Sequence, residues 1–145
     1  MDEFLKQLVS NAPDALLIAD REGIITFWNR GAERIFGHTA AEAVGRSLDL
    51  IIPENLRKRH WDGYGEVMAA GKTRYETGLL TSPGIRKDGV RLSLEFSMIL
   101  LRNELGGMEG CASIMRDVTE RWSREKELRE RLTACEKNLA GSGGP

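Results

Sequence analysis

The clearest pattern in the chain lies in residues 90–101, where apolar and polar positions alternate from Val90 to Met98. A period of two predicts a β-strand that turns one face to a core and the other to solvent or a partner. The inward positions of this strand are Val90, Leu92, Leu94, Phe96, Met98 and Leu100. A turn-forming segment at 103–107 separates it from another apolar run at 108–116, so we predict that the two pair as a hairpin.

Shorter apolar runs predict three more strands. Residues 15–19 and 24–28 flank a segment of turn-forming residues, which predicts a second hairpin near the N-terminus. Residues 75–80 form a candidate strand, and the Thr-Ser-Pro-Gly sequence at 81–84 predicts a loop after it.

Helical signals occupy the start and the middle of the chain. Residues 4–9 predict a short amphipathic helix. Asn29 is suited to cap a helix that stops at Gly37, and Thr39 opens a capping box for another short helix. Residues 54–70 predict a longer helix, whose apolar face consists of Leu56, His60, Tyr64, Val67 and Met68.

A last helix is predicted from residue 119 to about residue 139. Its apolar positions are spaced 4, 3 and 4, and they are Leu128, Leu132, Cys135 and Leu139. This spacing is typical of a narrow coiled-coil seam. With helices in the middle and strands at both ends, the whole order indicates an α+β fold in which helices cover one face of a sheet.

Composition narrows the class of protein. The 21 basic and 22 acidic residues nearly cancel, so we expect no nucleic-acid partner and no binding to a membrane surface. No apolar stretch reaches the length of a membrane span, and the acidic start is unlike a signal peptide. Two cysteines fit a reducing cytoplasm, and the scattered His and Cys residues predict no zinc site.

Four short motifs, in order, resemble the PAS sensory domain family over roughly residues 5–121. They are the Phe-Trp-Asn-x-x-Ala-Glu-x-x-Phe-Gly sequence at 27–37, the Glu-Ala-Val-Gly at 42–45, the Lys-Asp-Gly at 87–89 and the Asp-Val-Thr-Glu at 117–120. The resemblance implies a five-stranded antiparallel sheet with short helices on one face, enclosing a small-molecule pocket or a filled core. It also implies sensing and signal relay, often by homodimers, with no catalysis by the domain itself.

On this resemblance we divide the chain into four parts. They are an N-terminal amphipathic helix (1–12), a sensor domain (13–118), a C-terminal signalling or coiled-coil helix (119–140) and a disordered tail (141–145). We find no phosphate-binding glycine loop, nucleophile–base pair or kinase motif, so we expect a sensory module of a bacterial-type signalling protein. Any catalytic output would lie in a partner or an effector such as a histidine kinase or a cyclase.

The haem-binding oxygen sensors of this family are the most similar type. They carry an axial histidine in a stretch similar to residues 56–64, which makes His60 the implied haem ligand. The cofactor-binding set implied with His60 comprises Leu56, Tyr64, Leu80, Phe96 and Met98. Flavin is not expected, because residues 45–51 lack the cysteine that flavin-binding members carry nearby.

Two features leave alternatives open. Oxygen sensors of this type often place an arginine before the Lys-Asp-Gly turn, whereas residues 77–80 here contain none. Independently of the resemblance, a histidine on an apolar helix face is commonly an ordinary core residue. The alternative to haem sensing is therefore a PAS dimerisation and relay module with a non-haem small ligand or no cofactor.

Overall fold

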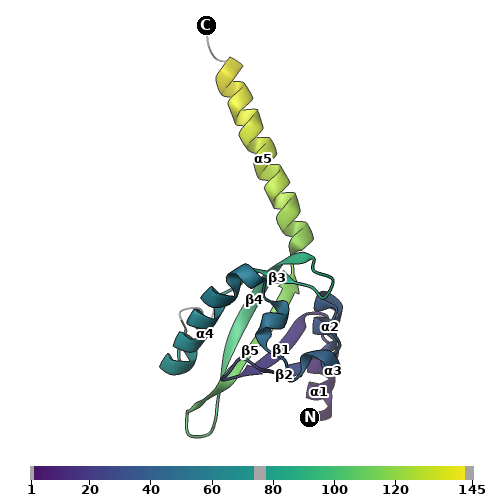
Figure 1. Cartoon of the computed structure of the whole chain (residues 1–145). Helices are drawn as coiled ribbons and strands as arrows, with labels where there is room; N and C mark the ends of the chain where they lie inside the picture. Colours follow the sequence, from purple (N-terminus) through teal and green to yellow (C-terminus); the bar gives the residue numbers. More distant parts are fainter. Residues whose placement is uncertain (1, 74–77, 143–145) are drawn as a thin grey trace.

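The computed structural model describes residues 2–73 and 78–142. Its strands form a five-stranded antiparallel sheet in the order β2-β1-β5-β4-β3 (Figure 1). The elements in chain order are α1 (Asp2–Asn11), β1 (Ala15–Asp20), β2 (Ile25–Trp28), α2 (Arg30–Phe36), α3 (Ala40–Ala43), the 3-10 turns η1 (Leu48–Ile51) and η2 (Glu54–Leu56), α4 (Arg57–Ala70), β3 (Leu80–Ile85), β4 (Arg91–Arg102), β5 (Met108–Asp117) and α5 (Thr119–Ser142).

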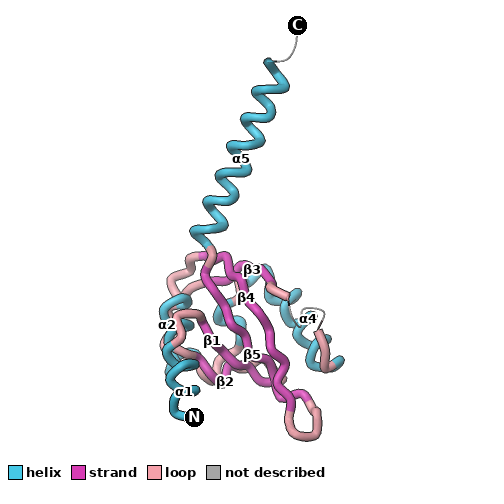
Figure 2. Tube along the Cα trace, turned by 180° about the vertical axis from the view of Figure 1, so that it is seen from behind, coloured by secondary structure: helices cyan, strands magenta, loops and turns pink. Residues whose placement is uncertain are grey.

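Both predicted hairpins are confirmed. β1 pairs with β2, and β4 pairs with β5 over a long register that places Phe96 opposite Met115 and Met98 opposite Ser113. β1 also pairs with β5, so the N-terminal hairpin joins the sheet beside the last strand. Helices α2, α3 and α4 lie on one face of this sheet, and Figure 2 shows the sheet from behind.

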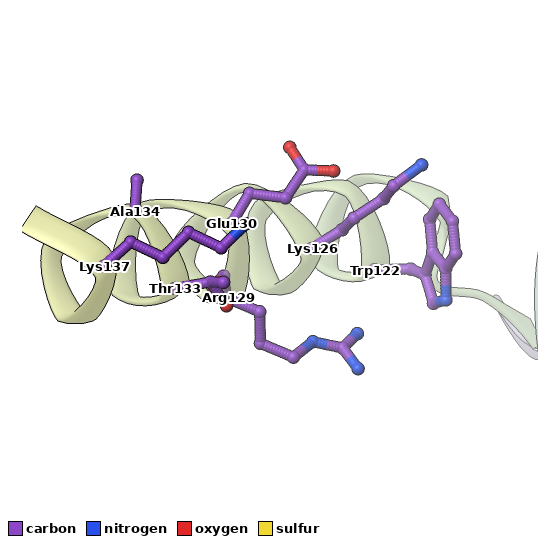
Figure 3. A pocket seen from close by; sticks show the side chains of 7 residues that line it. All are labelled: Trp122, Lys126, Arg129, Glu130, Thr133, Ala134 and Lys137. Atoms are coloured by element: carbon purple, nitrogen blue, oxygen red, sulfur yellow. The ribbon is translucent and has the colours of Figure 1, made fainter. Parts of the chain in front are cut away.

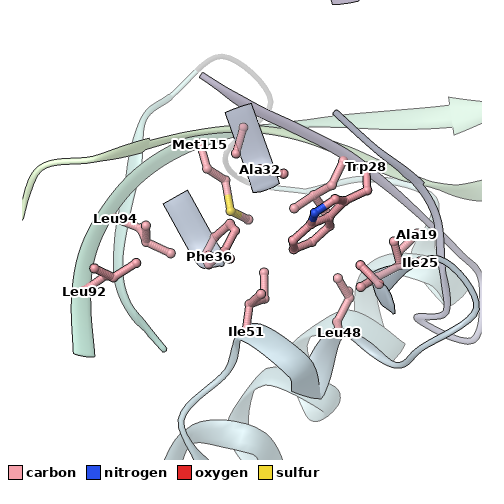
Figure 4. Close-up of a cluster of buried hydrophobic side chains, with 13 residues drawn as sticks. Ala19, Ile25, Trp28, Ala32, Phe36, Leu48, Ile51, Leu92, Leu94 and Met115 are labelled. Atoms are coloured by element: carbon pink, nitrogen blue, oxygen red, sulfur yellow. The ribbon is translucent and has the colours of Figure 1, made fainter. Parts of the chain in front are cut away.

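The main hydrophobic core fills the space between the sheet and the short helices (Figure 4). Phe36 of α2 and Ile25 of β2 are fully buried in it. The ring of Trp28 lies against Phe36 at a centroid distance of 5.5 Å, and its indole N–H donates to the His38 carbonyl at 2.9 Å. This core supports the wall of the site described below, because Leu48 and Ile51 of η1 belong to it.

The predicted helix signals are confirmed in atomic detail. The Asn29 side chain caps α2 by accepting from the Ala32 N–H, and Thr39 caps α3 by accepting from the Glu42 N–H. Gly37 ends α2 with a φ of +81°, a left-handed conformation that favours glycine.

The predicted loop at 81–84 is wrong, and of the described residues 78–80 of the predicted strand only Leu80 lies in a strand. The strand is Leu80–Ile85, and it pairs with β4 so that Ser82 lies opposite Leu94. β3 is an edge strand, and an edge strand accommodates proline because it needs ladder hydrogen bonds on one side only. Gly84 suits a close approach, since a Cβ there would lie 2.5 Å from Cδ1 of Leu94. Residues 75–77 of the predicted strand lie outside the described residues.

Two further boundaries differ from the sequence prediction. Val90 precedes β4 and is 47% exposed, whereas the alternation places it inward. α5 extends through Ser142, past residue 141 where a disordered tail was predicted, and residues 143–145 lie outside the described residues. Within 2–73 and 78–142, no helix combines the length and the apolar character that crossing a bilayer requires.

Candidate functional site

Helix α4 lies beside the sheet and is tied to it along its length. The Tyr64 hydroxyl donates to the Asp20 carbonyl, at the end of β1, over 2.5 Å. At the C-terminal end of α4, the Arg102 guanidinium of β4 donates to the Gly71 carbonyl, and Met68 packs with Met108. These contacts fix the face of α4 that carries His60 toward the inner face of the sheet.

Two spaces meet at His60. One is an inner cavity of about 100 Å³ between the sheet, η1 and α4. The other is a cleft of about 630 Å³ that follows α4 on its C-terminal side. His60, Tyr64 and Met98 line both spaces, so these three side chains form the partition between them.

The other predicted cofactor residues divide between these spaces. Phe96 lines the inner cavity, and Leu80 lines the cleft. Leu56 lines neither of the two spaces, because it belongs to η2 and lies before the first turn of α4. The structure therefore brings five of the six predicted residues together around one partition.

The His60 imidazole is chemically suited to bind a metal. Its Nδ1 atom is buried and has no hydrogen-bond partner among the residues that the structure describes. Burial lowers the pKa of His60, although the Asp49 carboxylate opposes this effect. The neutral ring that results keeps one nitrogen lone pair, which is the form that ligates iron.

Several residues of the inner cavity escape prediction from sequence. Ser113, Cys111 and Met115 point inward from alternate positions of β5. The remaining lining residues come from β1, from η1 and the residue after it, from β3 and from β4. They are Leu17 and Ala19, then Leu48, Ile51 and Ile52, then Ser82 and Pro83, and finally Leu94. The period of two over 111–115 is a signal that could have found the β5 residues. Burial raises the pKa of the Cys111 thiol, so this side chain stays protonated at neutral pH.

Charged groups at the cleft are few. Lys72 and Glu66 line it. Arg57 instead turns toward η1, where it donates to the Ile52 carbonyl at 3.1 Å, and Lys58 pairs with Asp62 on the exposed side of α4. Among the described residues that line the cleft, Lys72 is therefore the cation available to an acidic ligand.

Apart from the two spaces at His60, a shallow hollow lies on α5. All of its lining residues come from this single helix (Figure 3), and they are Trp122, Lys126, Arg129, Glu130, Thr133, Ala134 and Lys137. A ligand there would have a wall on one side only. Nor do the described residues contain a group of three or more His, Cys, Asp or Glu side chains that could hold a metal ion. His60 and the two spaces around it are thus the candidate cofactor site.

Acidification is expected to destabilise the folded chain through His60. Burial holds the pKa of His60 in the folded chain below the ordinary value of 6.5 for a histidine, so between these two pKa values the unfolded chain binds more protons. Stability is therefore lost as the pH falls from 6.5 toward the folded-state pKa. Replacing His60 with glutamine should reduce the drop in unfolding free energy between about pH 7.5 and about pH 5.5, measured by urea denaturation. Equal drops in the two proteins would contradict this account.

Comparison with known proteins agrees with this architecture. The family model described as the PAS fold matches residues 9–122. Sensor protein FixL of Bradyrhizobium diazoefficiens is 29% identical over 127 residues, which are 87% of this chain and 25% of that protein. Oxygen sensor protein DosP of Escherichia coli is 25% identical over 92% of this chain and 16% of its own length. The chain thus spans a quarter or less of these curated relatives.

Solved structures share the fold. An RNA-binding light-oxygen-voltage receptor superposes with a TM-score of 0.75 at 24% identity, over 92% of this chain and 37% of that chain. A PAS domain from Colwellia psychrerythraea gives a TM-score of 0.69 at 22% identity, over 81% of this chain and 97% of the other. The sheet order, the helices on one face and the extent of the family match lead to one conclusion: this chain is a sensory module of signalling proteins and belongs to the PAS fold family.

Proposed function

We propose that this PAS module binds haem through His60 and senses a diatomic gas or a redox state. The observation that carries the proposal is the buried Nδ1 atom of a neutral imidazole, which has no hydrogen-bond partner among the described residues and lies at the partition between the two spaces. Bound haem would supply an iron centre whose ligation or oxidation state reports the signal. The names of two relatives, a sensor protein and an oxygen sensor protein, support a signal of this kind.

The residues around His60 fit such a group. The cleft volume of about 630 Å³ lies within the roughly 300–1,000 Å³ typical of ligand sites. Leu80 and Met98 offer apolar walls, and Lys72 offers a cation for a carboxylate of the cofactor. The absence of an arginine at positions 78–80 favours CO or NO as the gas, or a different source of oxygen stabilisation.

Titration of the purified chain with haemin tests the proposal. Absorbance spectroscopy measures the Soret band during the titration. We expect the absorbance of this band to grow to a plateau at one haemin per chain. A titration of the same buffer without protein gives the absorbance of free haemin as the reference. Absorbance that rises without a plateau, or that matches free haemin, would contradict haem binding at a defined site.

A second candidate function is the binding of a smaller non-haem ligand. The inner cavity, at about 100 Å³, is well below the size of most ligand sites, and its walls are mainly aliphatic, aromatic and sulfur-containing side chains. A small apolar molecule matches that space and that lining. If haemin does not bind, this reading and a PAS relay without cofactor become the preferred ones.

We further propose that α5 pairs with α5 of a second copy and carries the signal toward an effector, such as a histidine kinase or a cyclase. Its seam residues Leu128 and Leu132 are each at least 60% exposed, which is typical of an apolar stripe that packs against a second helix. Phe4 and Leu8 of α1 are also exposed and could add contact area, which about three heptads of α5 need.

The Leu132→Glu variant is expected to be monomeric at concentrations where the wild-type chain is dimeric. Two buried leucines are lost per dimer, at about 1.5–3 kcal/mol each, so the dissociation constant should rise about 100-fold or more. Analytical ultracentrifugation measures this change. Ala134→Glu, two residues further on the opposite side of α5, serves as the matched control and should stay dimeric. A monomeric wild-type chain would contradict the pairing of α5 and would indicate that this helix is only a linker.

A further inference from the structure

The segment that precedes α4 carries a carboxylate aimed at this helix. Asp49 lies in η1, whose neighbours Leu48 and Ile51 are buried in the core. The Ser47 hydroxyl accepts from the Asp49 N–H at 3.1 Å and caps this turn. Asp49 is therefore held by its own element, independently of α4.

Two side chains of α4 bind this segment. The Trp61 indole N–H donates to Oδ1 of Asp49 at 2.7 Å, a charge-assisted hydrogen bond. Arg57 donates to the Asp49 carbonyl at 3.3 Å, and its Nε lies 3.9 Å from the same Oδ1 atom. Residues 57 and 61 are four apart and share one face of the helix, so together they fix the rotation of α4 about its axis.

The opposite side of the Trp61 ring is also closed. The ring lies over Gly23 in the turn between β1 and β2, where an added Cβ would come within 2.1 Å of the Trp61 ring. Trp61 is thus confined between this turn and Asp49. Its ring meets the His60 ring edge-on, at a centroid distance of 4.7 Å.

His60 needs an external restraint of this kind. Histidine ligands of metals commonly donate their second N–H to an oxygen atom that orients the ring. For His60, the buried Nδ1 atom makes no hydrogen bond to the described parts of the chain, so no hydrogen bond at this nitrogen orients the ring. Successive residues of a helix are about 100° apart, so a fixed Trp61 also fixes the direction in which His60 leaves the helix.

We propose that Asp49 and Trp61 are positioning residues for His60, acting through the rotation of α4 and the contact between the two rings. The idea rests on the proposed function only for its consequence in haem binding. In the haem-free chain, the Trp61–Asp49 hydrogen bond holds the His60 ring in one orientation.

Three variants test this inference. Trp61→Phe keeps an aromatic ring but removes the N–H donor, and Asp49→Ala removes the acceptor. Asp49→Asn keeps a neutral acceptor and should rescue much of the effect. Trp122→Phe, in the exposed first turns of α5, is the matched control.

Nuclear magnetic resonance of the imidazole rings is the primary measurement, and the chain holds only two histidines. We expect the His60 ring signals of the haem-free protein to broaden or split in Trp61→Phe and Asp49→Ala, whereas those of His38, beside Glu42, stay unchanged. In the same two variants haemin affinity should fall about tenfold, as for other residues that orient a metal ligand.

The two proposals fail in different ways. If the wild-type chain takes up no haemin, the proposed function falls, and the ring signals still decide whether Trp61 and Asp49 position His60. If the His60 signals of Trp61→Phe equal those of the wild type, the positioning role is overturned, whatever the haemin titration shows. A loss of signal at both histidines would likewise overturn it, because it would indicate general loosening of the fold.

Discussion

Replacement of His60 by alanine is expected to abolish stoichiometric haemin uptake while the fold persists. In the proposed site the His60 imidazole is the nitrogen ligand at the partition of the two spaces. Its removal should therefore lower haemin affinity by more than the roughly 100-fold that the loss of an outer-shell partner can cost. The cost in stability should be small, because the buried Nδ1 atom makes no hydrogen bond to the described residues. A haemin titration followed at the Soret band measures the first effect, and far-ultraviolet circular dichroism checks the second.

The matched control for this variant is His38→Ala. His38 lies in the turn between α2 and α3, with Nδ1 3.6 Å from a Glu42 oxygen, remote from both spaces. The His38→Ala variant should therefore bind haemin as the wild-type chain does in the Soret titration. Added imidazole should restore part of the binding in His60→Ala, because the small ligand can enter the space that the side chain vacated. Undiminished haemin affinity in His60→Ala would place the ligand elsewhere and remove the basis of the proposed function.

The parts of the fold that sequence reasoning predicted are those set by local patterns. The alternation over 90–101 becomes β4, and the caps at Asn29 and Thr39 start helices as predicted. The inward direction of His60 follows from the 3.6-residue period of α4 alone. Such signals act over a few residues and need no knowledge of tertiary contacts.

The failures arise where tertiary structure overrides a local signal. The Ser-Pro-Gly of β3 reads as a loop, but the edge of a sheet tolerates proline and Leu94 uses the space at Gly84. The helical spacing predicts that Leu56 continues the apolar face of α4. It belongs instead to a 3-10 turn with about three residues per turn, so its direction around the helix axis differs from that of His60.

The inner cavity could not be predicted from the sequence. Its walls come from β1, η1, α4, β3, β4 and β5, and these elements meet only through the strand order and the register of the sheet. The Trp61–Asp49 hydrogen bond has the same origin. It joins two residues that are twelve positions apart in the sequence, and the distance between them depends on how η1 and α4 each pack on the core.

Replacement of Asn29 by aspartate is expected to destabilise the fold by about 3 kcal/mol or more, although the two side chains have nearly the same shape. Asn29 is only 3% exposed. Its Oδ1 accepts from the N–H groups of Leu16 and Ala32 at 2.8 and 2.9 Å. Its Nδ2 donates to the Val9 and Asp14 carbonyls at 2.9 and 3.1 Å, which ties the end of α1 to the sheet.

Aspartate preserves the first pair of these hydrogen bonds and reverses the second. A carboxylate oxygen in place of Nδ2 would face carbonyl oxygens in a buried site, so its charge would be neither solvated nor paired. Protonation would restore one donor, which raises the pKa of the new carboxyl group above that in the unfolded chain. The variant should therefore regain stability relative to the wild type as the pH falls through that raised pKa.

Urea denaturation at two pH values separates this mechanism from a general packing defect. Asn55→Asp is the matched control, because Asn55 is exposed and its Oδ1 accepts from the Arg91 guanidinium, which favours a carboxylate. That control should change the unfolding free energy by about 0.5 kcal/mol or less. An Asn29→Asp chain whose deficit does not shrink on acidification would show that lost packing, not the reversed hydrogen bond, weakens the fold. A deficit in unfolding free energy that shrinks on acidification would show that the buried Asn29 amide, with an acceptor at one end and a donor at the other, holds α1, β1 and α2 together.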